Sequence, residues 1–177
     1  MKRKISIIVG AALLALLGVN DKVNAQVTDA TVRVDGLSCP FCAYSLEKQL
    51  KKVNGTGDVA IEVNDGIAAL TASDGQSIGV EQLEEAVKKA GFTPRGITIT
   101  VVGHLEEMAG YPALHVPVGD ITLVLEKNKQ FDRLKRAVGD KPKEVKIRGK
   151  IYQDNMDGHT GHPYSLAIET FEIIGSS

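Results

Sequence analysis

The fold of this chain is decided by Gly36-Leu37-Ser38-Cys39-Pro40-Phe41-Cys42, which holds the only two cysteines of its 177 residues. The stretch lies between an alternating strand pattern and an amphipathic helix pattern, so Cys42 is expected to start the helix and Cys39 to lie in the loop before it. A helix N-terminus lowers the pKa of a cysteine because its unpaired N–H groups favour the thiolate, which is the form that binds metals. Two soft sulfur donors on one turn suit Cu(I), Hg(II) or Zn(II) better than Ca(II) or Mg(II).

The segment from Thr31 to Ile99 is predicted to form a strand, a helix, two strands, a helix and a strand. Apolar and polar residues alternate over 32–35 and 58–63, and a short apolar run over 67–72 follows the Asn64-Asp65-Gly66 turn. Apolar residues recur at spacings of three and four in both helices, at Ala43, Leu46, Leu50 and Val53 and at Val80, Leu83, Val87 and Ala90. Each helix therefore has one apolar face to cover the same side of a four-stranded sheet.

Residues 31–99 resemble a heavy-metal-associated domain, the βαββαβ ferredoxin-like module of periplasmic mercury-binding proteins, copper chaperones and metal-pumping ATPases. Residues 36–42 stand where that family has its Gly-Met-Thr/Ser-Cys-x-x-Cys loop, and Ala90-Gly91-Phe92 stands where it has Ala-Gly-Phe/Tyr before the last strand. The resemblance implies metal binding by Cys39 and Cys42, with Phe92 packing near the loop. Leu37 replaces the usual Met, an apolar change of similar volume that should keep the loop anchored.

The residues between the cysteines keep a second hypothesis open. Pro40 and Phe41 depart from the family pattern and resemble the Cys-Pro-x-Cys centres of thiol oxidoreductases, which also lie at a strand-to-helix junction. A disulfide between residues this close would close a very short loop and add little stability. Metal binding is the prediction, thiol–disulfide exchange is the alternative, and an adaptor that senses metal supply is a third hypothesis.

Residues 1–25 have the pattern of a secretory signal peptide. Three basic residues precede an apolar run of 15 residues from Ile5 to Val19, and Val23-Asn24-Ala25 fits cleavage before Gln26. A bilayer-spanning helix needs about 20 residues. We therefore expect a periplasmic or secreted protein with no membrane span after cleavage.

The charge of the chain predicts no nucleic-acid partner. Residues 1–25 hold four of the 21 basic and one of the 22 acidic residues, which leaves 17 basic and 21 acidic residues and a net charge of −4. Such a chain has no overall attraction to a polyanion. A cluster of basic residues in the second half forms either a solvated face or a docking face for an acidic partner protein. Its members are Lys127, Lys129, Arg133, Lys135, Arg136, Lys141, Lys143, Lys146, Arg148 and Lys150.

The second half is predicted to be mostly β. The fold class is α+β, with a ferredoxin-like domain of residues 26–100 followed by a small OB-like barrel of residues 101–177 with one helix. The β-type segments are 97–103, 121–125, 145–151 and 165–174, and Phe131, Leu134 and Val138 mark a helix between Asn128 as its cap and Gly139 as its stop. No flexible linker separates the halves, so Gly96 to His104 is expected to run from one domain into the other.

The loop 154–163 is the other candidate site. His159, His162 and Met156 would form a second, weaker site for Cu(II), Zn(II) or Ni(II), although the same glycine-rich composition is typical of a flexible hairpin loop. His104 and His115 have no partner at a ligand-like spacing, and core or surface positions are expected for both.

The sequence has no serine elbow, phosphate-binding glycine loop or metalloprotease helix motif. We therefore predict a non-enzymatic protein that captures a soft metal ion, for sequestration or for transfer to a membrane metal transporter.

Overall fold

The computed structural model describes residues 26–38, 40–108, 110–139, 144–153 and 164–174. The predicted signal peptide therefore lies outside the described residues. The elements are β1 (Val27–Asp35), α1 (Pro40–Leu50), β2 (Thr56–Glu62), β3 (Ile67–Ala72), α2 (Val80–Lys89), β4 (Thr93–Met108), β5 (Tyr111–Val116), β6 (Ile121–Leu125), α3 (Lys129–Val138), β7 (Glu144–Gln153) and β8 (Tyr164–Ile174). No helix in these described ranges is long and apolar enough to cross a membrane.

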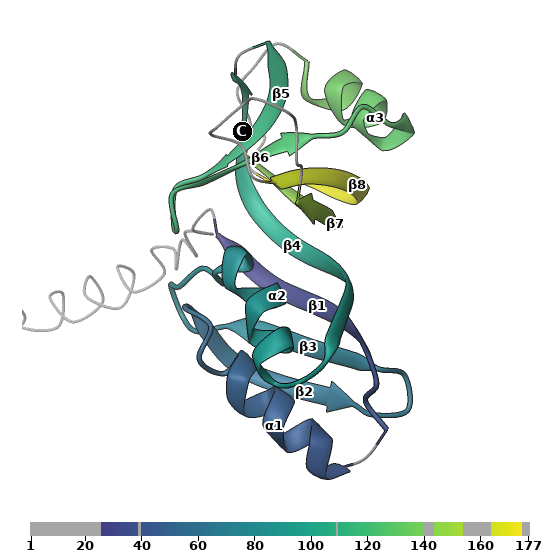
Figure 1. The fold of residues 1–177 in the computed structure, drawn as a ribbon. Helices are drawn as coiled ribbons and strands as arrows, with labels where there is room; N and C mark the ends of the chain where they lie inside the picture. Colours follow the sequence, from purple (N-terminus) through teal and green to yellow (C-terminus); the bar gives the residue numbers. More distant parts are fainter. Residues whose placement is uncertain (1–25, 39, 109, 140–143, 154–163, 175–177) are drawn as a thin grey trace, which may run out of the picture.

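The first six elements form the predicted α+β arrangement. Their strands pair in the order β2-β3-β1-β4, all antiparallel, and α1 and α2 cover one face of this sheet (Figure 1). The apolar spacing of the helices is confirmed, because Leu46 and Leu50 of α1 and Leu83 and Val87 of α2 are all fully buried. The sequence-based start of the first helix was wrong by two residues. The helix begins at Pro40 instead of Cys42, since proline has the helical φ and needs no hydrogen-bond partner in the first turn.

Strand β4 joins the two halves of the molecule. It is 16 residues long, pairs with β1 along Thr93–Val101, and pairs on its other edge with β7 along Ile97–His104. The residues Ile97–Val101 are thus hydrogen-bonded to a strand on each side. The expected continuous run from Gly96 to His104 is confirmed as part of this one strand, and the predicted boundary between residues 100 and 101 lies inside it.

The strands of the second half close into a ring. The order β4-β5-β6-β8-β7 returns to β4, and only the β6–β8 pair among these described strands is parallel. Helix α3 lies between β6 and β7, and the Asn128 side chain caps it by accepting hydrogen bonds from the N–H groups of Gln130 and Phe131 at 2.9 Å. Strand β5 is absent from the sequence-based prediction, and it contains Pro112, a residue type that is unusual inside strands.

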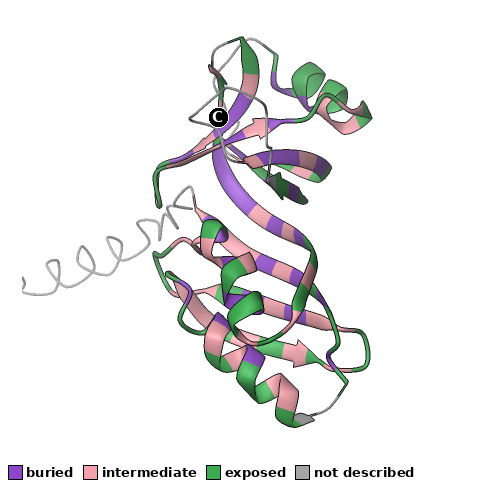
Figure 2. Cartoon of the chain, in the orientation of Figure 1, coloured by how far each residue is buried: buried purple, intermediate pink, exposed green. Residues whose placement is uncertain are grey.

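One hydrophobic core runs through both halves. Ile97, Ile99 and Val101 of β4 are 5 %, 0 % and 0 % exposed, and they belong to the same cluster as Leu46 of α1 and Leu166 of β8. Figure 2 shows this buried stretch in the middle of β4, between the helix-covered sheet and the ring. Because β4 contributes to both sides, the two halves are expected to stabilise each other.

The halves also touch beside β4. The phenol of Tyr164, at the start of β8, lies near α2, and its pKa is raised by burial and further by the carboxylates of Glu81 and Glu84. The Val102 N–H donates to the carbonyl of Gln26 at 2.9 Å. These contacts fix the ring against the first sheet near the N-terminal end of α2.

Glycines in two ring strands allow their neighbours to come close. A Cβ atom on Gly103 would lie 2.6 Å from the carbonyl oxygen of His115, and a Cβ atom on Gly149 would clash with the carbonyl oxygen of Ala167. The β7–β8 pairing shifts register between Arg148 and Gly149, as expected for a strand that bends. Ring closure therefore depends on residues without side chains at these positions.

We predict that Gly149→Ala destabilises the protein by about 1–3 kcal/mol, the typical cost of overpacking, because the β8 backbone cannot move without breaking the ring. The matched control is Gly96→Ala in β4, where a Cβ atom would meet nothing within 4 Å. That variant should stay within about 0.5 kcal/mol of the parent chain. Urea unfolding followed by circular dichroism measures both, and equal stability of the two variants would contradict the close-approach argument.

Candidate metal centre

The predicted metal loop lies where β1 ends and α1 begins. Gly36 has φ +87°, a backbone conformation that glycine adopts without strain, and the next side chain, Leu37, is buried. Cys39 lies outside the described residues. Cys42 occupies the first turn of α1, is partly buried and packs against the hydrophobic core. The loop is therefore anchored on both sides of Cys39 by side chains that contact the core.

Cys42 lies at the N-terminal, positive end of the α1 dipole. The first turn of α1 contains no acidic residue, so the positive end of the helix dipole is not neutralised there by a carboxylate of that turn. Cys42 is disulfide-bonded in the structure.

Phe92 is brought to this loop from the other end of the first half. It follows Gly91, which ends α2 with φ +90°, and its N–H donates to the carbonyl of Val87 at 3.2 Å. A Cβ atom on Gly36 would lie 3.8 Å from Cδ1 of the Phe92 ring. The half-buried ring therefore lies beside the start of the loop.

An ion pair that the sequence did not predict lies next to Gly36. The Nε atom of Arg95, on β4, donates to the carboxylate of Asp35, the last residue of β1. Both side chains are more than half exposed, so the pair contributes little to stability. Only the register that sets Asp35 opposite Thr93 brings these two residues together, and no sequence spacing signals it.

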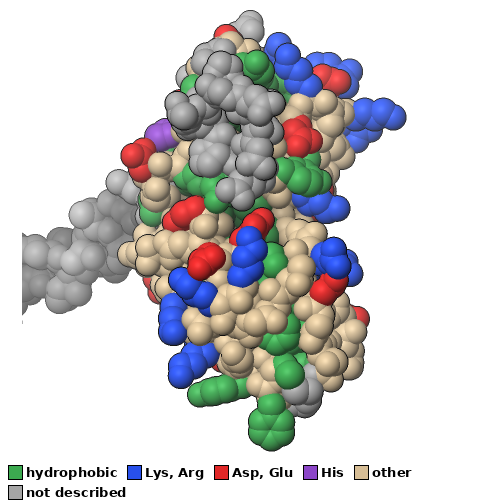
Figure 3. All heavy atoms as spheres, in the orientation of Figure 1, with side chains coloured by type: hydrophobic (Ala, Val, Ile, Leu, Met, Phe, Trp, Pro, Cys, Tyr) green, Lys and Arg blue, Asp and Glu red, His purple; other side chains and the backbone are tan. Residues whose placement is uncertain are grey.

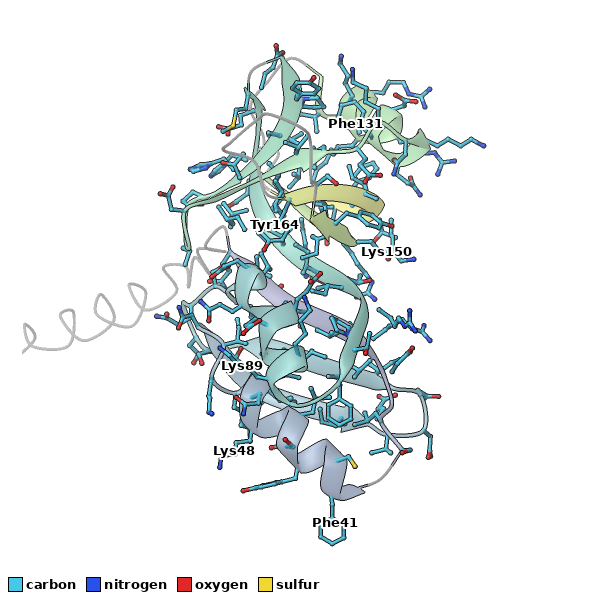
Figure 4. All side chains as sticks on the ribbon, in the orientation of Figure 1. Phe41, Lys48, Lys89, Phe131, Lys150 and Tyr164 are labelled. Atoms are coloured by element: carbon cyan, nitrogen blue, oxygen red, sulfur yellow. The ribbon has the colours of Figure 1, made fainter. Side chains whose placement is uncertain are left out.

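Two aromatic side chains project from α1 into solvent. Phe41 is 91 % exposed and Tyr44 is 69 % exposed. Phe41 points away from the body of the protein at the tip of the helix, and apolar side chains protrude at the same end in the space-filling view (Figures 3 and 4). Exposed aromatics beside a metal loop are available for contact with another molecule.

Positive charge lines the exposed face further along α1. Lys51 pairs with Glu47 at 2.7 Å, and this hydrogen bond raises the pKa of the lysine. Lys48 is also exposed, and its position on the solvent side of α1 is visible in Figure 4. The exposed side of α1 therefore carries aromatic side chains near the loop and a lysine in its last turn.

The remaining predicted site residues divide into two groups. His159, His162 and Met156 lie outside the described residues. His104 and His115 are described, and they are direct register partners across β4 and β5. Sequence spacing missed this pair because the hairpin alone sets its register. Among the described residues, no three His, Cys, Asp or Glu side chains gather into a group able to hold a metal ion.

Comparison with known proteins points to a metal-binding family. The model of the heavy-metal-associated domain matches residues 31–93. The chain is 30% identical over 79 residues to the mercuric transport protein periplasmic component of Pseudomonas fluorescens, a match that spans 45% of this chain and 86% of the relative. It is 24% identical over 66 residues to the copper chaperone CopZ of Staphylococcus epidermidis, which covers 37% of this chain and 96% of that protein.

Solved structures were also compared with the chain. The crystal structure of oxidized MerP from Ralstonia metallidurans CH34 is 26% identical and has a TM-score of 0.35, and the match covers 39% of this chain and 94% of that one. The family match falls on the first half of the molecule, where the cysteine loop lies.

We predict that Phe92→Ala destabilises the protein by about 2 kcal/mol, since a half-buried ring at the core edge is removed and a cavity remains beside Gly36. Phe41→Ala serves as the control, because a residue this exposed loses no packing and should change stability by less than about 0.5 kcal/mol. Thermal and urea unfolding measure both. A Phe92→Ala variant as stable as Phe41→Ala would show that the ring does not support the loop.

Proposed function

This chain belongs to the heavy-metal-associated domain family, and from that membership we propose that it captures a soft metal ion through the thiolates of Cys39 and Cys42. The observation that carries the proposal is the position of Cys42. This residue lies in the first turn of α1, after the loop that follows β1, within the segment that matches the family. Leu37 and Phe92 would support the loop from the core and from the α2–β4 junction.

The ion is proposed to be Cu(I) or Hg(II), with Zn(II) as a third candidate. Thiolates bind soft ions strongly, and a two-sulfur site can be linear, which suits the first two ions. Among the relatives, one is named a copper chaperone and another a mercuric transport protein. The ion is cargo in this proposal, so the protein acts by ligand exchange and not as an enzyme.

Export is supported by the pattern of residues 1–25, and one relative is named a periplasmic component. We infer a periplasmic or secreted protein that either sequesters the ion or passes it to a membrane metal transporter. The exposed Phe41 and Tyr44 beside the loop offer a surface on which such a transporter could dock.

The second half is proposed to be an OB-like barrel that follows a ferredoxin-like domain of residues 26–100. The closed ring β4-β5-β6-β8-β7, with α3 between β6 and β7 in the chain, supports this proposal. Its helix α3 exposes Lys129, Arg133, Lys135 and Arg136, and basic side chains cluster in this region in Figure 3. An acidic partner protein would dock on this face.

The alternative function is thiol–disulfide exchange by the same two cysteines. It is favoured by Pro40 and Phe41 between them, the pattern of oxidoreductase centres. In that reaction the dithiol would reduce a substrate disulfide and become a disulfide itself.

We predict that Cys39→Ser and Cys42→Ser each abolish tight Cu(I) binding, because one sulfur cannot complete even a two-coordinate site. Anaerobic titration of the reduced mature chain against a chromophoric Cu(I) chelator measures the affinity. The parent chain should hold one equivalent. If both single variants still hold one tight equivalent, the thiolate pair is not the site.

The same proteins separate the two functions. The parent chain is expected to leave the rate of insulin reduction by dithiothreitol unchanged. Catalytic acceleration that is lost in both serine variants would favour the oxidoreductase.

We also predict that a chain of residues 26–100 folds and binds Cu(I) alone, since it contains a complete sheet with its two helices. It should be less stable than the mature chain, because Ile97 and Ile99 of β4 lose their pairing with β7. Urea unfolding of both proteins, monitored by circular dichroism, provides the comparison. An unfolded fragment beside a stable full chain would show that the halves form one cooperative unit.

A further inference from the structure

We propose that His104 and His115 form a second metal site, a chelate of two imidazoles for a borderline divalent ion such as Cu(II), Zn(II) or Ni(II). The site lies on the outer face of the ring, and it is separate from the cysteine loop. Neutral imidazole is a good ligand for these ions, and two of them in fixed positions bind more tightly than one.

The β4–β5 register places the two side chains together. His104 and His115 are direct Cα partners in this antiparallel pair. Direct partners point to the same face of a sheet, with Cβ atoms about 4.5–5.5 Å apart. The neighbouring Leu114 and Val116 are buried, whereas His104 is exposed and His115 is half-buried, so both imidazoles lie on the outer face. An ion from solvent can reach both rings.

The strands on either side extend the pair into a row of polar groups. Glu144 of β7 is the register partner of His104, and Thr122 of β6 is the register partner of His115. The order across four strands is therefore Glu144, His104, His115 and Thr122. Glu144 adds a negative charge next to the imidazoles, which favours a bound cation.

Thr122 orients one of the rings. Its hydroxyl oxygen lies 3.4 Å from Nδ1 of His115. A hydrogen bond at one ring nitrogen fixes the ring and leaves the other nitrogen for a metal. Nε2 of His115 is thus the ligand atom in this proposal. Since the described residues contain no group of three metal-binding side chains, water completes the coordination shell.

The histidine pair and the cysteine loop cannot share an ion. The loop begins next to Asp35, whose partner on β4 is Thr93, and His104 lies eleven residues further along the same strand. At about 3.3 Å per residue this is roughly 35 Å along the strand. The two sites are expected to bind independently.

The test uses the mature chain with Cys39→Ser and Cys42→Ser, so that the thiolates do not compete, and Cu(II) as the probe. Isothermal titration and electron paramagnetic resonance report affinity and nitrogen coordination. His104→Gln and His115→Gln should each weaken Cu(II) binding at least tenfold and reduce the number of coordinated nitrogens. Thr122→Val should weaken it less, because the threonine positions a ligand and does not coordinate. The control, His159→Ala with His162→Ala, should leave this affinity unchanged.

A second measurement does not depend on substitutions in the pair. Cu(II) added to the chain without cysteines should broaden the amide resonances of His104, His115 and their neighbours first. The proposal would be overturned by unchanged Cu(II) affinity in both glutamine variants, or by loss of Cu(II) binding only in the His159→Ala/His162→Ala control. It would also be overturned if the amide resonances of other residues broadened first.

Discussion

The double pairing of β4 is the constraint on which the rest of this structure depends. Over Ile97–Val101 the strand is hydrogen-bonded to β1 on one edge and to β7 on the other. Its buried face, with Ile99 fully inaccessible, contributes to the core under α1 and α2 and to the interior of the ring. A strand in this position cannot shift by one residue, because the shift would turn its apolar face outward on both sides at once.

The fixed register of β4 also determines which residues lie beside each of its ends. At its N-terminal end, Phe92 and Thr93 lie against Gly36 and Asp35, so the cysteine loop is held against a rigid strand. At its C-terminal part, His104 is set between Glu144 and His115. The cysteine loop therefore lies near one end of β4, and the histidine pair lies near the other end. Family membership bears on the cysteine loop alone, because the matched residues end at 93.

The loop before α1 illustrates how packing supports a cysteine at a helix start. Leu37 is buried and Phe92 is half-buried beside the loop, whereas Phe41 and Tyr44 on the adjacent helix turn are exposed. The apolar groups that hold the loop are thus separate from those that face solvent. Such a division leaves Cys42 partly exposed while neighbouring side chains pack against the core.

The sequence by itself determined the order of elements in the first half, both helix faces, the cap at Asn128 and the stop at Gly139, because each depends on residues close together in the chain. It also placed Cys42 at the start of a helix, within two residues of the observed boundary. Only the tertiary structure decided the closure of the ring, the pairing of β4 with β7, the Asp35–Arg95 contact and the approach of His104 to His115. These features depend on strand register between distant segments, and register is set by the shared core and by close backbone approaches such as that of Gly149, which no local pattern encodes.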